Sequence, residues 1–283
     1  MEISEGAIRI LAGLLEARTG QQLAVARRWR IEAALRPLLL SFAAPSLEML
    51  AMRVVSGAEP RLTDAVIEAL LNHETFFYRD MGSFELFADQ GLGRLHAARR
   101  NERRLRIWSA GCSTGQEVYT LAMLIAGRPD RWAGWSIEIL GTDLSAPAIA
   151  RARAGRYSHL EIQRGLPIVQ MLGCFEQRGE HWFVTDRLRA AVSFKIHNLV
   201  EPPPAGSFDV ILCRNVLLYF SADIRRLVFG RLASAIAPDG LLMLGAGEIA
   251  LGQTDQFVSD YACRGFYRRR IDRPEEIERA ARR

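Results

Sequence analysis

The N-terminal part of the chain repeats apolar and polar positions with the period of amphipathic helices. Between residues 8 and 15 the isoleucine and leucine positions recur at helical spacing, and Gly20 is placed to end that helix. Residues 27–40 repeat the pattern, and Thr63 is a candidate N-cap for a further helix. The pattern predicts a small all-helical N-terminal domain with a linker over residues 1–80.

From about residue 104 the chain alternates between apolar, strand-like runs and helical patterns. The expected strands, in chain order, contain LRIWSA, WSIEILGTD, AVSFKIHNL, FDVILC, LLMLGAGE and GFYRRR. The last helix is expected to run to a breaker at Pro238-Asp239-Gly240. This rhythm predicts an α/β domain over residues 81–275, with a mostly parallel sheet covered on both faces.

One segment interrupts this rhythm between the second helix and the third strand. Residues 157–191 contain CFEQRGEHWFV, in which Arg178 and Gly179 suit the turn of a short hairpin. We expect a small inserted antiparallel β subdomain, or flap, at this place. The last residues, 276–283, are expected to form a charged C-terminal tail.

Composition narrows the classes of protein that fit. Hydrophobic residues make up 49% of the 283 residues, and no apolar run approaches the roughly 18 residues of a membrane span. The N-terminus is typical of an amphipathic helix and not of a signal peptide. The four cysteines are scattered and the five histidines lack metal-binding spacing, so we expect neither disulfides nor a metal site. A reducing cytoplasm is therefore the expected compartment.

The formal net charge is +5, with arginine clusters at 27–30, 99–104 and 268–273. A basic surface favours an acidic partner, a class that includes nucleic acid, an anionic membrane and an acidic protein. Solvated helix faces and helix ends explain any one of these clusters equally well.

The turn after the first strand, GCSTGQE at residues 111–117, has the composition of a ligand-binding turn. Gly111 lets the backbone approach a ligand closely, and the following helix offers free N–H groups at its start. The segment is neither a Walker A motif nor G-x-G-x-x-G, and Glu117 would repel phosphates. We therefore expect a ligand that is not a polyphosphate. A simple strand-to-helix turn is the alternative.

Polar side chains follow the next two strands. Asp143 ends the second strand, where a carboxylate can accept hydrogen bonds from both hydroxyls of a ribose. Asn198 and Leu199 follow the third strand and suit the flank of an adenine ring. Together with the glycine turn, these residues point to an adenosine ligand. The alternative for Asp143 is a helix cap, although Ser145 is the better candidate for that role.

A charged residue also stands at the mouth of the buried fourth strand. Arg214 and Asn215 follow this strand directly, and Tyr219 lies one helical turn beyond Asn215 if a helix begins there. A charge at that position is costly unless it is paired or lines a site. An ordinary arginine–acid pair with a packed tyrosine is the alternative. Because ligands bind beyond the carboxyl ends of parallel strands, we expect the four strand ends to share one cleft.

Six segments of the chain carry a family resemblance. They are ETFFYRD, WSAGCSTGQE, GTDLS, HNL, FDVILCRNVLLYF and GLLMLGAGE. In order and spacing they resemble the motifs of the CheR-type chemotaxis receptor methyltransferases, which are S-adenosylmethionine (SAM)-dependent protein-glutamate O-methyltransferases. The resemblance covers nearly the whole chain, and CRNVLLYF together with ETFFYRD is highly specific. It implies a Rossmann-like SAM methyltransferase sheet with a small helical N-terminal domain and a small inserted antiparallel β subdomain.

The resemblance also assigns roles to single residues. For the cofactor it implies contacts from His73, Thr75, Arg79, Gly111, Glu117, Asp143, Asn198, Leu199, Arg214 and Asn215. The first three would reach its methionine end, and Asp143 would bind its ribose. Asn198 and Leu199 would flank its adenine. Arg79 and Tyr219 would lie nearest the transferring methyl, and they are the candidate catalytic residues.

Three positions depart from the family's usual pattern. His73 stands where the family usually has asparagine, although Asn72 is adjacent. The residues 116–118 keep the second acid of the usual motif, Glu117, and lose its proline. The usual Arg-Leu pair of the second helix is replaced by Ala34-Leu35, on the surface expected to face the receptor.

The resemblance implies methyl transfer from SAM to glutamate side chains of chemoreceptors, with S-adenosylhomocysteine as the second product. The partner is then the acidic, helical cytoplasmic region of the receptors, on which a basic helix carrying Arg27, Arg28, Arg30 and Arg36 can dock. Neither nucleic acid nor membrane insertion is expected, and a monomer is favoured. The alternatives are a SAM-dependent methyltransferase acting on a small molecule or nucleic acid, and a non-catalytic SAM-binding signalling scaffold.

Overall fold

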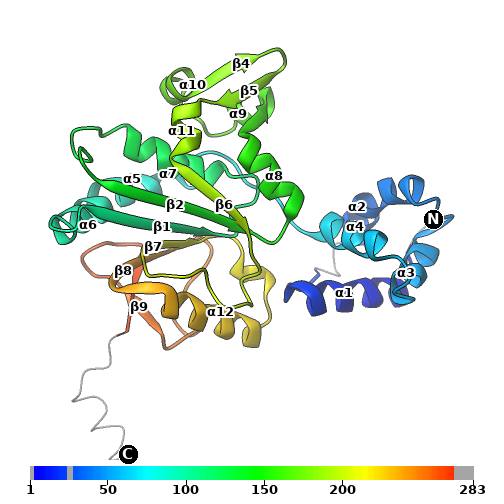
Figure 1. Ribbon diagram of the computed structural model, residues 1–283. Helices are drawn as coiled ribbons and strands as arrows, with labels where there is room; N and C mark the ends of the chain where they lie inside the picture. Colours follow the sequence, from blue (N-terminus) through cyan, green and yellow to red (C-terminus); the bar gives the residue numbers. More distant parts are fainter. Residues whose placement is uncertain (1–2, 24–27, 271–283) are drawn as a thin grey trace, which may run out of the picture. The chain divides into compact units, whose positions relative to one another are not determined.

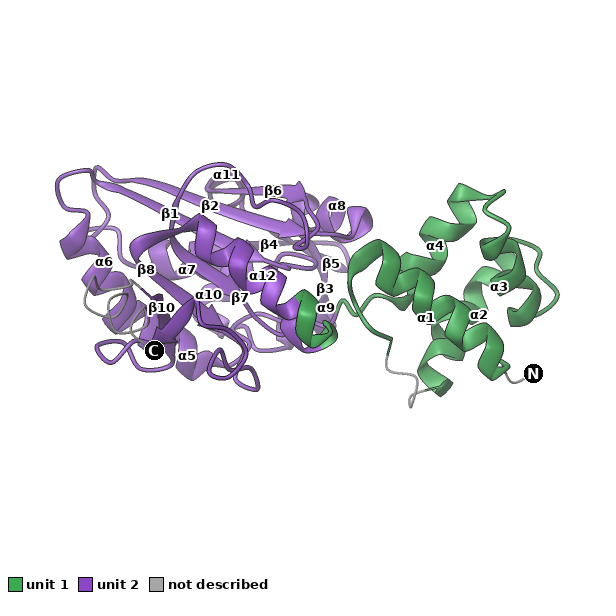
Figure 2. Ribbon diagram, turned by 90° about the horizontal axis from the view of Figure 1, so that it is seen from below, with its two compact units in different colours: residues 1–73, 219–224 green, residues 74–218, 225–283 purple. Residues whose placement is uncertain are grey.

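The computed structural model describes residues 3–23 and 28–270, which form two compact units (Figure 2). The first unit comprises the residues up to 73 together with 219–224, and the second comprises the remainder. Each unit has its own hydrophobic core. Arg27 of the predicted docking helix and the predicted tail at 276–283 lie outside the described residues.

The first unit is helical. Its long helices are α1 (Glu5–Thr19), α2 (Arg28–Ser41), α3 (Leu47–Val55) and α4 (Pro60–Leu70) (Figure 1). The hydroxyl of Ser4 accepts a hydrogen bond from the Ala7 N–H and starts α1. Gly20, with a φ of 76°, ends this helix in the left-handed conformation, as predicted. The apolar faces of the helices pack into one core.

The start of α4 differs from the prediction. The helix begins at Pro60, earlier than the predicted cap Thr63. Proline suits the first turn of a helix because its missing N–H would have no partner there. Thr63 is instead buried inside the helix, where its hydroxyl donates to the Glu59 carbonyl at 3.3 Å.

A short segment from far along the chain completes the first unit. Gln21 and Phe220 form an isolated antiparallel bridge, and the Gln22 N–H donates to the Tyr219 carbonyl at 2.6 Å. Phe220 is only 3% exposed. The helical unit therefore includes residues that follow most of the sheet in sequence.

The second unit is built on a seven-stranded sheet in the order β6-β2-β1-β7-β8-β10-β9 (Figure 1). Its strands are β1 (Arg104–Ala110), β2 (Ser136–Asp143), β6 (Val192–Ile196), β7 (Phe208–Cys213), β8 (Ile236–Leu244), β9 (Phe257–Ser259) and β10 (Phe266–Arg269). The first five strands of this order are parallel to one another, whereas β10 is antiparallel to β8 and β9. This mixed sheet confirms the predicted α/β, Rossmann-like class.

Helices cover both faces of this sheet (Figure 1). α7 (Gln116–Ala126) and α8 (Ala146–Ala154) pack against β2 and β6, and α12 (Ala222–Ala235) lies on the other face. Before β1, the chain forms α5 (Met81–Leu86), the π-helical turn η2 (Phe87–Gly91) and α6 (Leu92–Ala98). Phe84 and Phe87 of this stretch belong to the same core as α7.

Two boundaries late in the sheet differ from the prediction. α12 ends at Ala235, and the predicted breaker Pro238 lies inside β8. The β7–β8 pairing shifts register between Phe208 and Val210, and such an irregularity accommodates a proline because no ladder N–H is needed there. No helix begins at Asn215, which has a φ of 59°, and a single 3-10 turn, η3 (Leu217–Tyr219), follows it.

The inserted segment forms a separate three-stranded antiparallel sheet in the order β3-β5-β4, which confirms the predicted β subdomain. Its elements are β3 (Arg156–Ser158), α9 (His159–Gln163), α10 (Ile168–Cys174), β4 (Phe175–Arg178) and β5 (His181–Val184). Ser158 and Glu161 form a capping box that starts α9. The short helix α11 (Asp186–Ala190) then leads back to β6.

Candidate functional site

The turn from β1 into α7 has positive φ angles at Gly111 (84°), Ser113 (49°) and Gly115 (92°). Space also restricts the two glycines. A Cβ on Gly111 would lie 2.5 Å from Val216 Cγ2, and a Cβ on Gly115 would lie 2.9 Å from the Cβ of Ala152. Glycine therefore lets the chain turn sharply at the end of β1 and present the first N–H groups of α7 there.

The carboxylate of Asp143 ties this glycine turn to the turn after β2. Its Oδ2 accepts a hydrogen bond from the Ser113 N–H at 2.7 Å, and its Oδ1 accepts one from the Ser145 N–H at 3.0 Å. Ser145 caps α8, since its hydroxyl accepts from the Ala148 N–H at 3.0 Å. Asp143 thus places a half-buried carboxylate at the carboxyl end of β2, where such sheets bind a ribose.

Glu117, in the first turn of α7, is held by two side chains. Its Oε1 accepts from the Ser109 hydroxyl at 2.8 Å, and its Oε2 accepts from Nη1 of Arg214 at 3.0 Å. The Glu117 side chain is 14% exposed. Its negative charge also suits the positive end of the helix dipole. The result is a fixed carboxylate beside the glycine turn.

Arg214 joins the start of α7 to the segment at residues 79–80. Its side chain is 1% exposed, and its Nη2 donates to Asp80 Oδ2 at 2.7 Å and to the Arg79 carbonyl at 2.8 Å. Its Cζ lies 4.9 Å from the centre of the Phe84 ring. These contacts describe the arginine–acid pair that the sequence left open as an alternative. A direct cofactor contact by Arg214 stays a prediction.

The aromatic residues of ETFFYRD anchor this segment within the second unit. Phe77 is fully buried, and its ring centre lies 5.0 Å from that of Tyr157 and 5.4 Å from that of Phe175, both in the inserted subdomain. The Tyr78 N–H donates to the Thr120 hydroxyl of α7 at 3.1 Å. The segment is therefore fixed to both α7 and the inserted subdomain.

Gly165, in the loop between α9 and α10, approaches the same segment closely. It has a φ of 82°, and a Cβ at this position would lie 2.1 Å from the Phe77 carbonyl oxygen and 3.1 Å from the ring of Phe76. Any side chain at Gly165 would therefore displace either the loop or the aromatic run.

The predicted site residues Thr75 and Arg79 are half-buried in this segment. Nη1 of Arg79 donates to the Glu74 carbonyl at 2.9 Å. Arg164 lies over the Phe76 ring and pairs with the Glu74 carboxylate at 2.7 Å. Arg79 forms no ion pair with any residue that the structure describes, so its charge is available to a ligand or substrate.

The residues after β6 are tied to the end of β2. The His197 N–H donates to the Asp143 carbonyl at 2.9 Å. Asn198 Oδ1 accepts from the Val200 N–H at 3.3 Å, and Leu199 is 7% exposed. Burial lowers the pKa of His197 below its usual value, which favours a neutral imidazole. The predicted adenine-flanking pair thus stands on a fixed turn next to Asp143.

Glu248 is an organising residue that the sequence analysis did not identify. Its carboxylate accepts from the backbone N–H groups of Asn215 (2.6 Å), Val216 (3.1 Å), Leu218 (3.3 Å) and Gly245 (2.9 Å). These bonds hold Asn215 in its left-handed conformation. The only signal in the sequence is an acid that closes the GAGE segment after a strand.

Two predicted site residues, His73 and Tyr219, belong to the first unit. The Tyr219 hydroxyl accepts a hydrogen bond from the side-chain nitrogen of Asn72. Asn72 in turn accepts from Nη2 of Arg30 at 2.7 Å. Nε2 of His73 lies 3.1 Å from Glu68 Oε1. Within this unit the chain therefore fixes the orientation of the Tyr219 ring through Asn72.

The two buried cysteines beside these turns are poor nucleophiles. Burial raises the pKa values of Cys112 and Cys213 well above the usual thiol value, so both stay protonated. Within the described residues, no group of three or more His, Cys, Asp or Glu side chains forms a metal site. No helix of the described part is long and apolar enough to cross a membrane.

The chemistry of the second-unit site comes from its carboxylates. Glu117 and Asp143 both border the glycine turn, each held by hydrogen bonds. Carboxylates accept hydrogen bonds from hydroxyls and attract cations, whereas they repel phosphates. The arrangement suits a ligand that carries ribose hydroxyls and positive charge.

Comparison with known proteins also indicates a ligand of this kind. The family described as CheR methyltransferase, SAM binding domain, matches residues 73–263. A chemotaxis protein methyltransferase of Vibrio parahaemolyticus is 36% identical over 259 residues, covering 90% of this chain and 93% of that protein. Chemotaxis protein methyltransferase 1 of Pseudomonas aeruginosa is 34% identical over 248 residues, covering 86% of this chain and 90% of that protein.

These matches confirm the resemblance found in the sequence motifs. They extend over most of the chain, and the family match includes every strand of the sheet except the last. The chain therefore belongs to the CheR methyltransferase family and is a methyltransferase whose cofactor is SAM.

Proposed function

We propose that this protein transfers the methyl group of SAM to glutamate side chains in the cytoplasmic helical region of chemoreceptors, forming glutamate methyl esters. The observation that carries the proposal is the extent of the similarity to chemotaxis protein methyltransferases, at 36% identity over 90% of the chain. A match of this length extends into the helical unit. We place the reaction in the cytoplasm.

The residues of the second unit fit SAM by their chemistry. SAM carries two ribose hydroxyls, an ammonium group and a positively charged sulfonium. Asp143 would hold the ribose, and Glu117 would hold polar groups of the cofactor beside the glycine turn. Asn198 and Leu199 would flank the adenine, as the resemblance implies.

A glutamate substrate requires no general base. Its side-chain pKa is near ~4.3, so it is already a carboxylate at neutral pH. Bound SAM supplies a methyl group on a sulfonium whose sulfur leaves as a neutral thioether, so no general acid is needed. The task of the protein is therefore to align the carboxylate and to exclude water.

We assign the alignment of the carboxylate or of the cofactor tail to Arg79 and Tyr219. Desolvation favours the neutral form of a carboxyl group, and a nearby cation opposes that effect. Arg79 can supply this cation, because it has no ion-pair partner in the described part of the chain. Since Asn72 donates to the Tyr219 oxygen, the phenol proton is left to donate to a further acceptor.

The proposal is tested by the alkali lability of the product. The protein is incubated with methyl-labelled SAM and receptor-containing membranes, and alkali is then added. We expect label in the receptor and its release as volatile methanol, because carboxyl methyl esters hydrolyse under these conditions. N-methyl or base-methyl products release no methanol and would indicate another substrate.

Two controls complete this experiment. A receptor whose cytoplasmic glutamates are replaced by alanine should take up no label. Intact SAM binding without any incorporation would contradict the proposal and favour a non-catalytic SAM-binding scaffold.

A further inference from the structure

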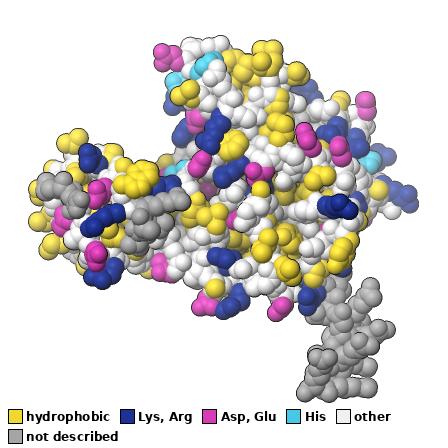
Figure 3. All heavy atoms as spheres, turned by 180° about the vertical axis from the view of Figure 1, so that it is seen from behind, with side chains coloured by type: hydrophobic (Ala, Val, Ile, Leu, Met, Phe, Trp, Pro, Cys, Tyr) yellow, Lys and Arg dark blue, Asp and Glu magenta, His cyan; other side chains and the backbone are white. Residues whose placement is uncertain are grey.

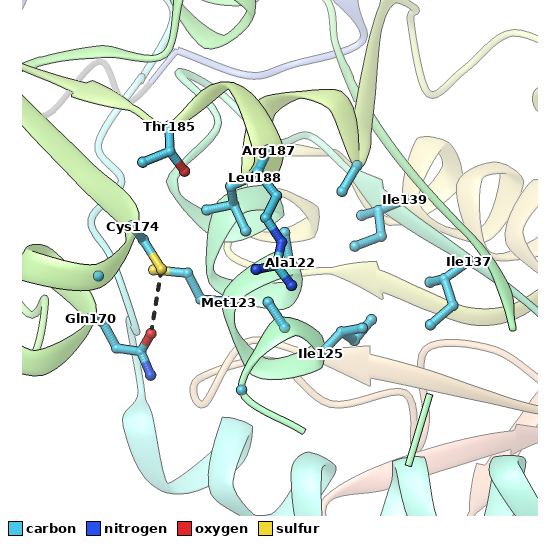
Figure 4. A pocket seen from close by; sticks show the side chains of 14 residues that line it. Ala122, Met123, Ile125, Ile137, Ile139, Gln170, Cys174, Thr185, Arg187 and Leu188 are labelled. Atoms are coloured by element: carbon cyan, nitrogen blue, oxygen red, sulfur yellow. Dashed lines mark hydrogen bonds between the residues drawn. The ribbon is translucent and has the colours of Figure 1, made fainter. Parts of the chain in front are cut away.

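A cavity of about 360 Å³ lies within the second unit, where the inserted subdomain meets the sheet domain (Figure 4). Its walls come from the C-terminal half of α7, the first part of β2, and the helices α10 and α11. Cavities of this size lie in the range that binds small organic molecules.

The walls of this cavity are mostly apolar. Met123 of α7, Ile137 and Ile139 of β2, and Leu188 of α11 supply large aliphatic side chains. Figure 4 shows these side chains turned toward a common space. Apolar walls of this kind gain free energy by removing an apolar ligand from water.

Arg187 supplies the single charge among the 14 described residues that line the cavity. Figure 4 shows its guanidinium directed from α11 into the space beside Ala122 and Met123. Its neighbours on the helix, Asp186 and Arg189, pair with each other at 2.7 Å. Arg187 forms no hydrogen bond or ion pair with any residue in the described part of the chain.

The lining also includes polar side chains apart from Arg187, namely Gln170, Cys174 and Thr185. The Cys174 thiol donates to Gln170 Oε1 over 3.7 Å, so the side-chain nitrogen of Gln170 is not used in that bond (Figure 4). The cavity therefore combines aliphatic walls with hydrogen-bond donors and an unpaired cation, and none of its lining residues is acidic.

We propose that this cavity binds a small apolar carboxylic acid in its ionised form. The alkyl or aryl body would lie against the isoleucine and methionine side chains. The carboxylate would pair with Arg187, whose planar fork matches a carboxylate in bidentate fashion. Arg187 is an exposed residue, so water solvates its charge when no acid is bound. A cationic head group would meet repulsion from this charge, and a purely apolar ligand would gain nothing from it.

The proposed site is separate from the residues assigned to SAM. Glu117 lies in the first turn of α7 and Asp143 ends β2, whereas the cavity touches the opposite ends of both elements. SAM and an apolar acid should therefore bind at the same time, which a titration of the SAM-saturated protein can measure.

The test compares two probes that differ only in their head group, octanoate and octanol. Calorimetric titration of the full chain should show saturable binding of octanoate at one site. Arg187→Gln should weaken octanoate binding about tenfold or more, the size of one lost charge-assisted hydrogen-bonded contact, and leave octanol binding unchanged. Arg189→Gln is the matched control, since it removes the same charge from the same helix outside the cavity, and it should leave both affinities unchanged.

Substitutions that fill the cavity test whether octanoate binds there. A Cβ added at Gly173 of α10 meets no atom within 4 Å, so Gly173→Trp can place its ring at the cavity without displacing the backbone. Ala191→Trp approaches from the α11 side. Both should abolish octanoate binding while the far-ultraviolet circular dichroism and SAM affinity are kept.

Several outcomes would overturn the proposal. They are the absence of saturable octanoate binding to the unchanged protein, equal losses in Arg187→Gln and Arg189→Gln, and unchanged octanoate affinity in both tryptophan variants. None of these outcomes affects the proposed glutamate methylation, which is measured in a separate assay.

Discussion

Arg79 and Tyr219, the two residues to which we assign alignment, are held in different ways. Arg79 has a single backbone partner, the Glu74 carbonyl, and its charge is unpaired among the described residues. Tyr219 is oriented by Asn72, which is itself held by Arg30. Arg79 therefore supplies an adaptable charge, whereas Tyr219 supplies a fixed hydroxyl.

Arg79→Ala and Tyr219→Phe should both lower kcat strongly. We expect losses of roughly a hundredfold for Arg79→Ala, which removes a charge acting in the transition state, and roughly tenfold for Tyr219→Phe, which removes one hydrogen bond. Asn72→Ala should reduce kcat less, because it only frees the ring. Receptor methylation rates with saturating SAM measure these effects, and near-normal rates in the first two variants would refute the assignment.

For single residues of the site, the sequence predicts the position in the fold but not the hydrogen-bond partners. The positions of Asp143 and Arg214 at strand ends follow from the apolar runs that precede them. Their partners do not follow, because Asp80 reaches Arg214 only after distant segments fold together. Glu248 escaped prediction for the same reason, since its four N–H partners converge from two loops.

At the scale of elements, the loop between α9 and α10 and the segment ETFFYRD depend on each other at Gly165. Gly165→Ala should lower the free energy of unfolding by about 2–4 kcal/mol, since it adds both left-handed strain and a clash with the Phe77 carbonyl. Urea unfolding measures this loss. SAM affinity should fall too, because Thr75 and Arg79 lie in the displaced segment.

Gly179→Ala is the control that separates the left-handed backbone strain from the clash with Phe77. Gly179 has a φ of 61°, and a Cβ there meets nothing within 4 Å. This variant should therefore lose only about 1 kcal/mol of stability and keep its SAM affinity. Equal losses in both variants would mean that the contact with Phe77 contributes nothing.

The elements themselves were largely predictable, because the strand and helix periods are strong in this chain. The errors arose where tertiary structure overrides a local signal. Pro238 resembles a helix breaker, yet an irregular register lets it sit in β8. Thr63 resembles a cap, yet Pro60 starts the helix earlier.

At the scale of the whole molecule, surface charge affects the proposed docking to an acidic region of the receptor. The net charge is +5, and Figure 3 shows Lys and Arg side chains spread over the visible face. On α2, Arg36 is exposed, whereas Arg30 also holds Asn72. A substitution of Arg36 therefore tests docking by this helix without also removing the contact with Asn72.

Arg36→Glu should raise the KM for receptor roughly three- to tenfold, leave kcat unchanged and flatten the dependence of KM on salt, because rim charges act through screened attraction. Arg9→Glu makes the same charge change on an exposed position of α1. Identical effects of the two variants would argue for a diffuse field instead of docking by α2.

The bridge between Gln21 and Phe220 also has a consequence for synthesis. During translation, N-terminal domains usually fold before the rest of the chain has emerged. Here residues 219–224 leave the ribosome only after β1, β2, β6 and β7 have been made. The helical unit therefore cannot complete its packing until residues 219–224, and with them most of the sheet, have been translated.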